Sequence, residues 1–125
     1  MPLTSGLRGT AELVVSDSDT APNHGSGVVP VLATPRLVAL CEQAAVAALD
    51  GELPDGSTSV SMRVQFDHLA PTLAGVCVTA EANLEKVSGR RLIFTVSAAD
   101  PRGLIAAGKV TRVVVDVERF LDKAR

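Results

Sequence analysis

Aromatic residues are almost absent from this 125-residue sequence, which contains three phenylalanines and neither tryptophan nor tyrosine. Proteins that bind single-stranded nucleic acid by base stacking rely on aromatic side chains, so this class is not expected. The formal net charge is −2, which provides no basic field for nucleic acid or anionic lipid. We therefore expect neither nucleic acid nor a membrane as a partner.

Cysteine and long apolar runs are also scarce. Cys41 and Cys77 lie in apolar stretches without metal or redox spacing, which favours free thiols in a reducing compartment. No apolar run approaches the roughly 18 residues that cross a bilayer, and the first residues do not resemble a secretory signal. No zinc signature, phosphate-binding glycine motif or serine nucleophile elbow occurs. These absences predict a cytoplasmic protein without a bound metal.

Hydrophobic residues make up 46% of the sequence, which is typical of one compact domain spanning residues 1–125. Alternating residues predict a first strand over 9–15. Residues 16–33 predict a loop, long enough to act as a lid. A helix is expected over 34–50, because Thr34 can cap it, Pro35 suits its first position, and Asp50-Gly51 ends it.

The predicted helix is apolar nearly all round, which indicates that protein surrounds it. Its segment 37–49 contains only two polar residues, Glu42 and Gln43. Four antiparallel strands in hairpin sequence are expected over 58–118, followed by a short polar helix. One sheet can cover only part of the helix, so a second copy must cover the rest. The predicted fold is therefore α+β, with a five-stranded antiparallel sheet wrapped around a central helix and paired as a homodimer.

Glu42 is a candidate functional residue, because apolar side chains occupy the turns before and after it. Burial penalises a carboxylate and should raise its pKa unless a hydrogen-bond donor stabilises the charge. Acidic residues are seldom buried without a partner, which favours a functional role. The alternative is a side chain that reaches water through a gap.

His68 is a second candidate. It ends the most regular strand pattern, in which Val60, Met62, Val64 and Phe66 share its face. A histidine where a strand meets the mouth of a cavity can exchange protons near neutral pH. The alternative is a structural histidine bonded to a backbone carbonyl.

Thr34 is the third candidate. Its hydroxyl can cap the helix, and the free backbone N–H groups at a helix start can also polarise the carbonyl of a substrate. Further along the chain lies a basic group: Lys86, Arg90, Arg91, Lys109 and Arg112. Such a group is typical either of a solvated face or of a site for the phosphates of a nucleotide.

Together these residues resemble the hotdog-fold thioesterases of the fluoroacetyl-CoA thioesterase type. The likeness extends from about residue 32 to residue 120 and depends on the run 29–42 (VPVLATPRLVALCE), on His68, and on the run 89–92 (GRRL). The resemblance implies that Thr34, Glu42 and His68 form the catalytic set. The family's fluoroacetyl-specific enzyme has aromatic residues in its lid, whereas residues 16–33 contain none, which argues against fluoroacetyl selectivity.

The expected function is therefore hydrolysis of a small or short-chain acyl-CoA, with coenzyme A as part of the substrate and no separate cofactor. In this interpretation Lys86, Arg90 and Arg91 bind the phosphates. His68 is the general base or carries the proton to the leaving thiolate. Glu42 orients His68 and water or attacks the acyl carbon, and Thr34 is a nucleophile or an oxyanion-binding residue.

The spacing of Thr34 and Glu42 constrains this site, because eight residues of helix rise about 12 Å. Either the helix starts later than predicted, or two subunits assemble the site. Hotdog thioesterases commonly build sites at their dimer interface, which favours the second reading; pairing of dimers into tetramers stays open. Two other functions also stay open: binding of an acyl-CoA without catalysis, and a hydratase, although the helix-borne Asp/His pair of hydratases is missing.

Overall fold

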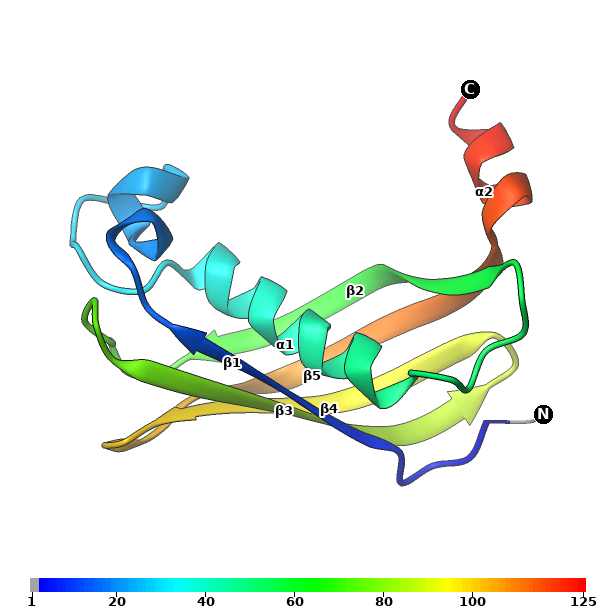
Figure 1. The fold of residues 1–125 in the computed structure, drawn as a ribbon, viewed down its shortest axis with the longest axis horizontal. Coiled ribbons are helices and arrows are strands. Elements are labelled where there is room, and N and C mark those ends of the chain that lie inside the picture. The colour runs from blue at the N-terminus through cyan, green and yellow to red at the C-terminus, as the bar shows by residue number, and fades with distance from the viewer. Residues whose placement is uncertain (1–2) are drawn as a thin grey trace.

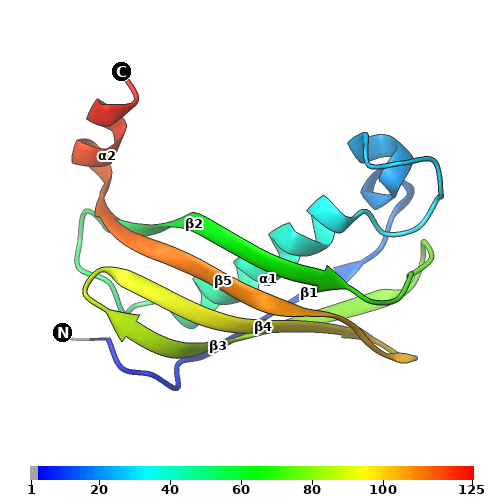
Figure 2. The same cartoon turned by 180° about the vertical axis from the view of Figure 1, so that it is seen from behind.

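The computed structural model describes residues 3–125; residues 1 and 2, which the predicted domain includes, lie outside the described residues. In chain order the elements are β1 (Arg8–Val14), the 3₁₀ turns η1 (Asp17–Asp19) and η2 (Ala21–His24), α1 (Thr34–Ala48), β2 (Ser57–His68), β3 (Cys77–Ser88), β4 (Arg91–Asp100), β5 (Gly103–Asp116) and α2 (Val117–Lys123). All five strands form one curled antiparallel sheet, and α1 lies across one face of it (Figure 1). Seen from behind, the opposite face carries no helix (Figure 2). The predicted α+β architecture is confirmed.

The strand order β1-β3-β4-β5-β2 corrects one predicted feature of the topology. Strands β3, β4 and β5 follow one another as hairpins, as expected, but β2 pairs with β5 rather than with β3. The connection 69–76 instead carries the chain past β5 and β4 to reach β3. Alternation along a strand identifies its two faces but not its neighbour, and so the hairpin between β2 and β3 was wrongly predicted.

A β-bulge in β2 changes which side chains face α1. The register with β5 shifts between Ser61 and Arg63, leaving Met62 as the extra residue. A bulge moves all later side chains to the opposite face. The prediction that Val60 shares the face of His68 is therefore wrong.

Aliphatic side chains build the core between α1 and the sheet, as the scarcity of aromatic residues requires. Leu37 and Leu40 of α1 are fully buried, together with Phe94 of β4. The helix packs mainly on β1, β3 and β4. Val64 and Phe66, on the inner face of β2, are therefore only partly covered.

The outer edge of β2 is open, and exposed apolar side chains occur on both β2 and α1. β2 pairs with one neighbour only, so the backbone groups of its outer edge are open. Met62, Val64 and Val46 of α1 are all exposed. Proteins normally cover such edges, which is consistent with the predicted homodimer. Among residues 3–125, no helix is long and apolar enough to cross a membrane.

Gly9 permits the close approach of β1 to α1. A Cβ atom built on Gly9 lies 2.2 Å from the carbonyl oxygen of Ala44 and 2.3 Å from the amide nitrogen of Ala48. Both atoms belong to the helix backbone, which cannot move aside as a flexible side chain would.

We predict that Gly9→Ala lowers the free energy of unfolding by about 1–3 kcal/mol, the usual effect of overpacking a core. Urea denaturation measures this change. Thr10→Ala, one residue along the same strand, is the matched control and should stay within about 0.5 kcal/mol of the parent. Equal stability of the Gly9→Ala variant and the parent would contradict the described packing.

Candidate functional site

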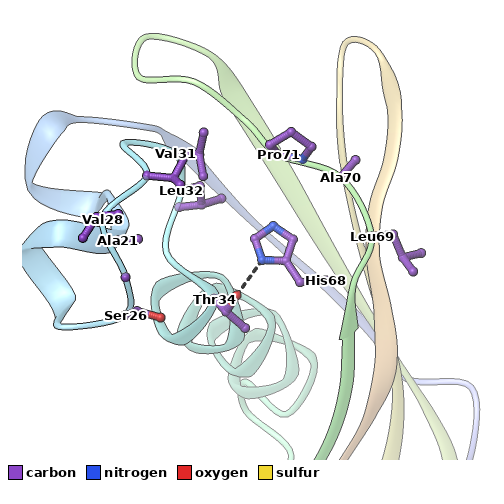
Figure 3. Close-up of a pocket in the computed structure, with 12 residues that line it drawn as sticks. Ala21, Ser26, Val28, Val31, Leu32, Thr34, His68, Leu69, Ala70 and Pro71 are labelled. Atoms are coloured by element: carbon purple, nitrogen blue, oxygen red, sulfur yellow. Dashed lines mark hydrogen bonds between the residues drawn. The ribbon is translucent and has the colours of Figure 1, made fainter.

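A hydrogen bond joins the start of α1 to the end of β2. The hydroxyl Oγ1 of Thr34 lies 2.7 Å from Nδ1 of His68, and both side chains border one cavity (Figure 3). Thr34 is the first residue of α1, and Ala33 is the N-cap without a side-chain cap. The prediction that Thr34 caps the helix is wrong, since its hydroxyl bonds to His68, and Pro35 occupies the second helical position.

The cavity beside this pair, called here the Thr34–His68 cavity, has a volume of about 290 Å³. One wall comes from residues 21–32 and the other from the connection that follows β2 (Figure 3). Most lining side chains are aliphatic, and several are open to solvent, with Val28 89% and Leu69 59% exposed. An apolar cavity with one polar pair is suited to a small molecule with an apolar end.

The lid segment, residues 16–33, begins with two 3₁₀ turns, η1 and η2, and continues over 25–33 as the predicted loop. Arg36 donates to Asp19 at 3.1 Å, and the Ala33 amide donates to the Asp19 carbonyl oxygen at 2.9 Å. Burial alone would raise the pKa of Asp19, but hydrogen bonds from Ser16 and Arg36 outweigh it and hold that pKa below its ordinary value. An ionised Asp19 therefore fixes the lid segment to the helix start.

His68 is held in its neutral form by its surroundings. Burial lowers the pKa of His68, and the nearby backbone of Ala70 offsets only part of this effect. The ring atom Nε2 is buried without a partner in hydrogen-bond geometry among residues 3–125. A neutral imidazole whose Nδ1 faces a hydroxyl can accept that hydroxyl's proton.

Glu42 lies two turns further along α1 and pairs with Arg112 of β5 instead of His68. Arg112 Nη1 donates to Glu42 Oε1 at 3.1 Å, and the same guanidinium donates to the hydroxyl and carbonyl oxygens of Ser59, both at 2.8 Å. Burial lowers the pKa of Arg112, and the Glu42 carboxylate partly offsets this effect. The predicted catalytic set is thus divided: one chain brings Thr34 and His68 together but leaves Glu42 apart.

The structure also excludes one of the two explanations of the Thr34 to Glu42 spacing. Because α1 begins at Thr34, a later helix start is excluded. Assembly from two subunits is the explanation that remains for a site containing both residues.

Arg112 was missed as a site residue, because its charge placed it with the predicted basic group. It is only 7% exposed and points toward α1. Val110 and Val114 lie two residues before and two residues after it. Alternate residues of a strand face the same side, so this pattern predicts that Arg112 faces inward.

The basic residues Lys86, Arg90 and Arg91 gather at the far end of the sheet. Lys86 and Arg91 lie on the outer face, since the adjacent Val87 and Leu92 face the core. Arg90 instead borders a pocket of about 200 Å³ whose other charged lining residues are Arg119, Lys123 and Asp116, with Phe120 and Val115 as its apolar lining. Among residues 3–125, no ion pair is formed by Arg90, Arg119 or Lys123. We call Arg90, Arg119 and Lys123 the basic pocket.

The basic pocket is remote from His68 within one chain. The Arg90 carbonyl oxygen accepts from the Val114 amide at 2.9 Å, whereas His68 pairs with Ala106. Val114 and Ala106 are eight residues apart on β5, which is about 26 Å along a strand. No group of three or more potential metal ligands occurs within residues 3–125.

Comparisons with known proteins show the family of the chain. The family model of fluoroacetyl-CoA-specific thioesterases matches residues 15–118. The chain belongs to this family. A fluoroacetyl-CoA thioesterase of Streptantibioticus cattleyicolor is 39% identical over 95 residues, which cover 76% of this chain and 68% of that protein.

Solved structures extend the likeness to the whole chain. A crystal structure of the fluoroacetyl-CoA thioesterase FlK matches with a TM-score of 0.93 and 33% identity, covering 100% of this chain and 97% of that one. A hot-dog-like protein from Thermanaerovibrio acidaminovorans matches with a TM-score of 0.88 and 31% identity, covering 98% and 90%. The family resemblance, the hotdog fold and the thioester-hydrolase class expected from the sequence are confirmed. The catalytic roles of Thr34, Glu42 and His68 stay predictions.

We predict that His68 titrates below about 6.5, the ordinary value for histidine, because its charged form is desolvated. NMR titration of the imidazole measures the midpoint, and a His68→Gln variant identifies the resonance. Since the pKa is lowered, the neutral base persists at pH values where an exposed histidine is protonated. A midpoint at or above 6.5 would contradict the buried, neutral histidine.

Proposed function

We propose that this chain hydrolyses small or short-chain aliphatic acyl-CoA thioesters to the free acid and coenzyme A. The observation that carries the proposal is the 2.7 Å contact between Thr34 Oγ1 and His68 Nδ1 at an aliphatic cavity. A hydroxyl hydrogen-bonded to a neutral imidazole is the arrangement of an activated nucleophile. Family membership supports the thioester as the reacting bond.

In the proposed reaction, His68 Nδ1 takes the Thr34 proton while Oγ1 bonds to the thioester carbonyl carbon. The tetrahedral intermediate collapses as the carbon–sulfur bond breaks, and His68 returns the proton to the leaving thiolate. Water then attacks the acyl-Thr34 ester with His68 again as base. The acid leaves, and Thr34 regains its proton.

The first turn of α1 provides donors for the oxyanion. Pro35 has no N–H, and the Leu37 amide already donates to the Ala33 carbonyl oxygen at 3.0 Å. The amides of Thr34 and Arg36 are therefore the free donors of this turn. The positive end of the helix dipole adds to their effect on developing negative charge.

Glu42 enters this mechanism through a homodimer. Pairing of two β2 edges about a two-fold axis covers the open backbone groups and the exposed side chains of Met62, Val64 and Val46. The two α1 helices then run side by side in opposite directions, so Glu42 of one subunit lies toward Thr34 of the other. Arg112 and Ser59 fix the Glu42 carboxylate there, where it orients the attacking water.

Coenzyme A lies across the same interface in this proposal. The distance of about 26 Å between the basic pocket and His68 of one chain exceeds the reach of an extended pantetheine arm. Antiparallel pairing of β2 brings the partner's basic pocket toward His68. Arg90, joined by Arg119 and Lys123 of α2, therefore binds phosphate for the partner's site, while Lys86 and Arg91 add positive charge nearby.

The remaining parts of the proposal concern substrate and location. The lid segment contains no aromatic residue, so we expect aliphatic acyl groups rather than selection for fluoroacetyl. A cytoplasmic location fits the two free thiols of Cys41 and Cys77.

We predict that Thr34→Ala and His68→Ala each lower kcat by about 10²- to 10⁴-fold, because each removes one member of the proton-transfer pair. Release of free thiol from a panel of acyl-CoA esters of increasing length measures turnover. Thr34→Ser is the control, because it keeps the hydroxyl and should retain most activity. Parental rates in the His68→Ala variant would remove the mechanism.

We also predict that Thr34→Ala and Glu42→Gln complement each other in mixed dimers. Each homodimer is inactive, but the heterodimer contains one site with an intact Thr34 and an intact partner Glu42. Random mixing should restore about a quarter of parental activity, since half of the dimers are mixed and each has one working site.

The control for this experiment is a mixture of Thr34→Ala and His68→Ala chains. These residues bond within one chain, so neither site of the heterodimer is complete and no activity should return. If neither mixture regains activity, Glu42 does not act across the interface.

A further inference from the structure

A buried carboxylate that the proposed reaction does not use lies at the hairpin between β4 and β5. Asp100, the last residue of β4, is only 8% exposed, and no ion pair with it occurs among residues 3–125. Its oxygen Oδ1 accepts from the Arg102 amide at 2.8 Å, and its oxygen Oδ2 accepts from the Thr72 hydroxyl at 2.9 Å. A carboxylate is costly to bury unless hydrogen bonds satisfy it, so these two bonds account for its place.

The bond to Thr72 serves a segment other than the hairpin itself. The turn is already closed by the Arg102 amide and by the pairing of Asp100 with Gly103. Thr72 lies 28 residues away in the connection 69–76 and is only 2% exposed. The second carboxylate oxygen therefore holds this connection to the end of β4.

The connection 69–76 also forms one wall of the Thr34–His68 cavity, directly after β2 (Figure 3). The Leu69 and Ala70 amides both donate to the Ile105 carbonyl oxygen of β5, at 2.7 and 3.2 Å. These bonds hold the first two residues of the connection. The next fixed point of the wall is the Thr72 hydroxyl.

Thr72 joins this wall to the segment that enters α1. Its carbonyl oxygen accepts from the Leu32 amide at 2.8 Å, and Leu32 lies two residues before Thr34. His68 lies four residues before Thr72 on the other side. A buried contact through Thr72 thus links the two segments that carry the Thr34 hydroxyl and the His68 ring. A shift of Thr72 changes the 2.7 Å separation between these groups.

We propose that Asp100 and Thr72 are positioning residues of the proposed active site, which set the separation of the Thr34 hydroxyl and the His68 ring. This inference rests on the proposed thioesterase function. Asp100 holds Thr72, and Thr72 holds both the connection after His68 and the segment before Thr34. A misplacement of about 1 Å between reacting groups can lower turnover about a hundredfold.

A first test measures turnover by thiol release from a short-chain acyl-CoA. Thr72→Val removes the hydroxyl and keeps the branched shape of the side chain. We expect its kcat to fall about tenfold or more, whereas KM should change less than twofold, because the cavity lining is unchanged. Thr72→Ser keeps the hydroxyl and should retain most of the parental kcat.

The matched control is Thr95→Val. The Thr95 hydroxyl donates to Glu85 at 3.0 Å, so the same kind of bond is lost, but at an exposed position between β3 and β4. Its kcat should stay within twofold of the parental value. Parental kcat in the Thr72→Val variant, or an equal loss in Thr72→Ser or Thr95→Val, overturns the proposal.

A second measurement does not depend on hydrolysis of any thioester. Within residues 3–125, no titratable side chain other than His68 borders the Thr34–His68 cavity. Burial lowers the pKa of His68, and a loosened connection admits water to its ring. NMR titration of Thr72→Val should therefore give a midpoint closer to about 6.5 than the parental midpoint. Thr95→Val should keep the parental midpoint, and an unchanged midpoint in Thr72→Val overturns the proposal.

Asp100→Ala removes the same bond from the other side and allows a double-mutant cycle. Its own loss of kcat should equal or exceed that of Thr72→Val, because it also removes the acceptor of the Arg102 amide. In the Asp100→Ala background, Thr72→Val should lower kcat less than twofold further, since the bond is already absent. Losses that multiply in the double variant show that the two residues act separately, which overturns the proposal.

The two readouts separate this proposal from the proposed function. If the parent hydrolyses no thioester but Thr72→Val raises the His68 midpoint, the proposed function is refuted and the hold of Thr72 on His68 stands. If the parent hydrolyses acyl-CoA and Thr72→Val keeps the parental kcat and midpoint, the positioning proposal is overturned and the function stands.

Discussion

The hydrogen bond between Thr34 and His68 joins the first residue of the helix to the last residue of an edge strand. A separation of 2.7 Å requires that α1 starts at the level where β2 ends. The segments that enter the helix and leave the strand must then lie side by side, and the Leu32 amide donates to the Thr72 carbonyl oxygen at 2.8 Å. The cavity between these segments follows from that contact. The depressed pKa of His68 follows as well, because the same segments bury its ring.

Much of this arrangement was predictable from local pattern. The long apolar run marked α1 as an enclosed helix, and the alternation of five segments marked the strands. Glu42 stood out as a charge on an apolar helix, Thr34 because it begins that helix, and His68 because it ends an apolar strand face. The bulge at Met62 was not predictable, since one extra residue exchanges the faces of a strand without changing its composition. The pairing of β2 with β5 was not predictable for a similar reason. Alternation in the sequence predicts the two faces of a strand, but it does not predict which strand pairs with it.

The ion pair of Glu42 and Arg112 shows a different limit of sequence reasoning. A carboxylate on an apolar helix indicates that some donor must exist, but the donor lies 70 residues away on β5. Three donations from one guanidinium to Glu42 and Ser59 fix the carboxylate in direction as well as in place. Buried ion pairs add little net stability because desolvation offsets their attraction. Fixed orientation is therefore the stronger reason for keeping a charge at this position, and it is what a residue serving a neighbouring subunit requires.

The proposed sharing of the site between subunits accounts for the separation of the candidate residues within one chain. One chain holds Thr34 and His68 at one end of β2, and the basic pocket lies about 26 Å from His68 along the sheet. Such a separation leaves neither end able to serve the other within one chain. Antiparallel pairing of the same strand removes the separation for both sites at once, because a two-fold axis applies every contact twice. The proposal therefore makes hydrolysis depend on assembly, because Glu42 reaches the cavity beside Thr34 and His68 only from the partner subunit. In the proposed dimer, the length of one edge strand sets the distance over which the two groups of residues are brought together.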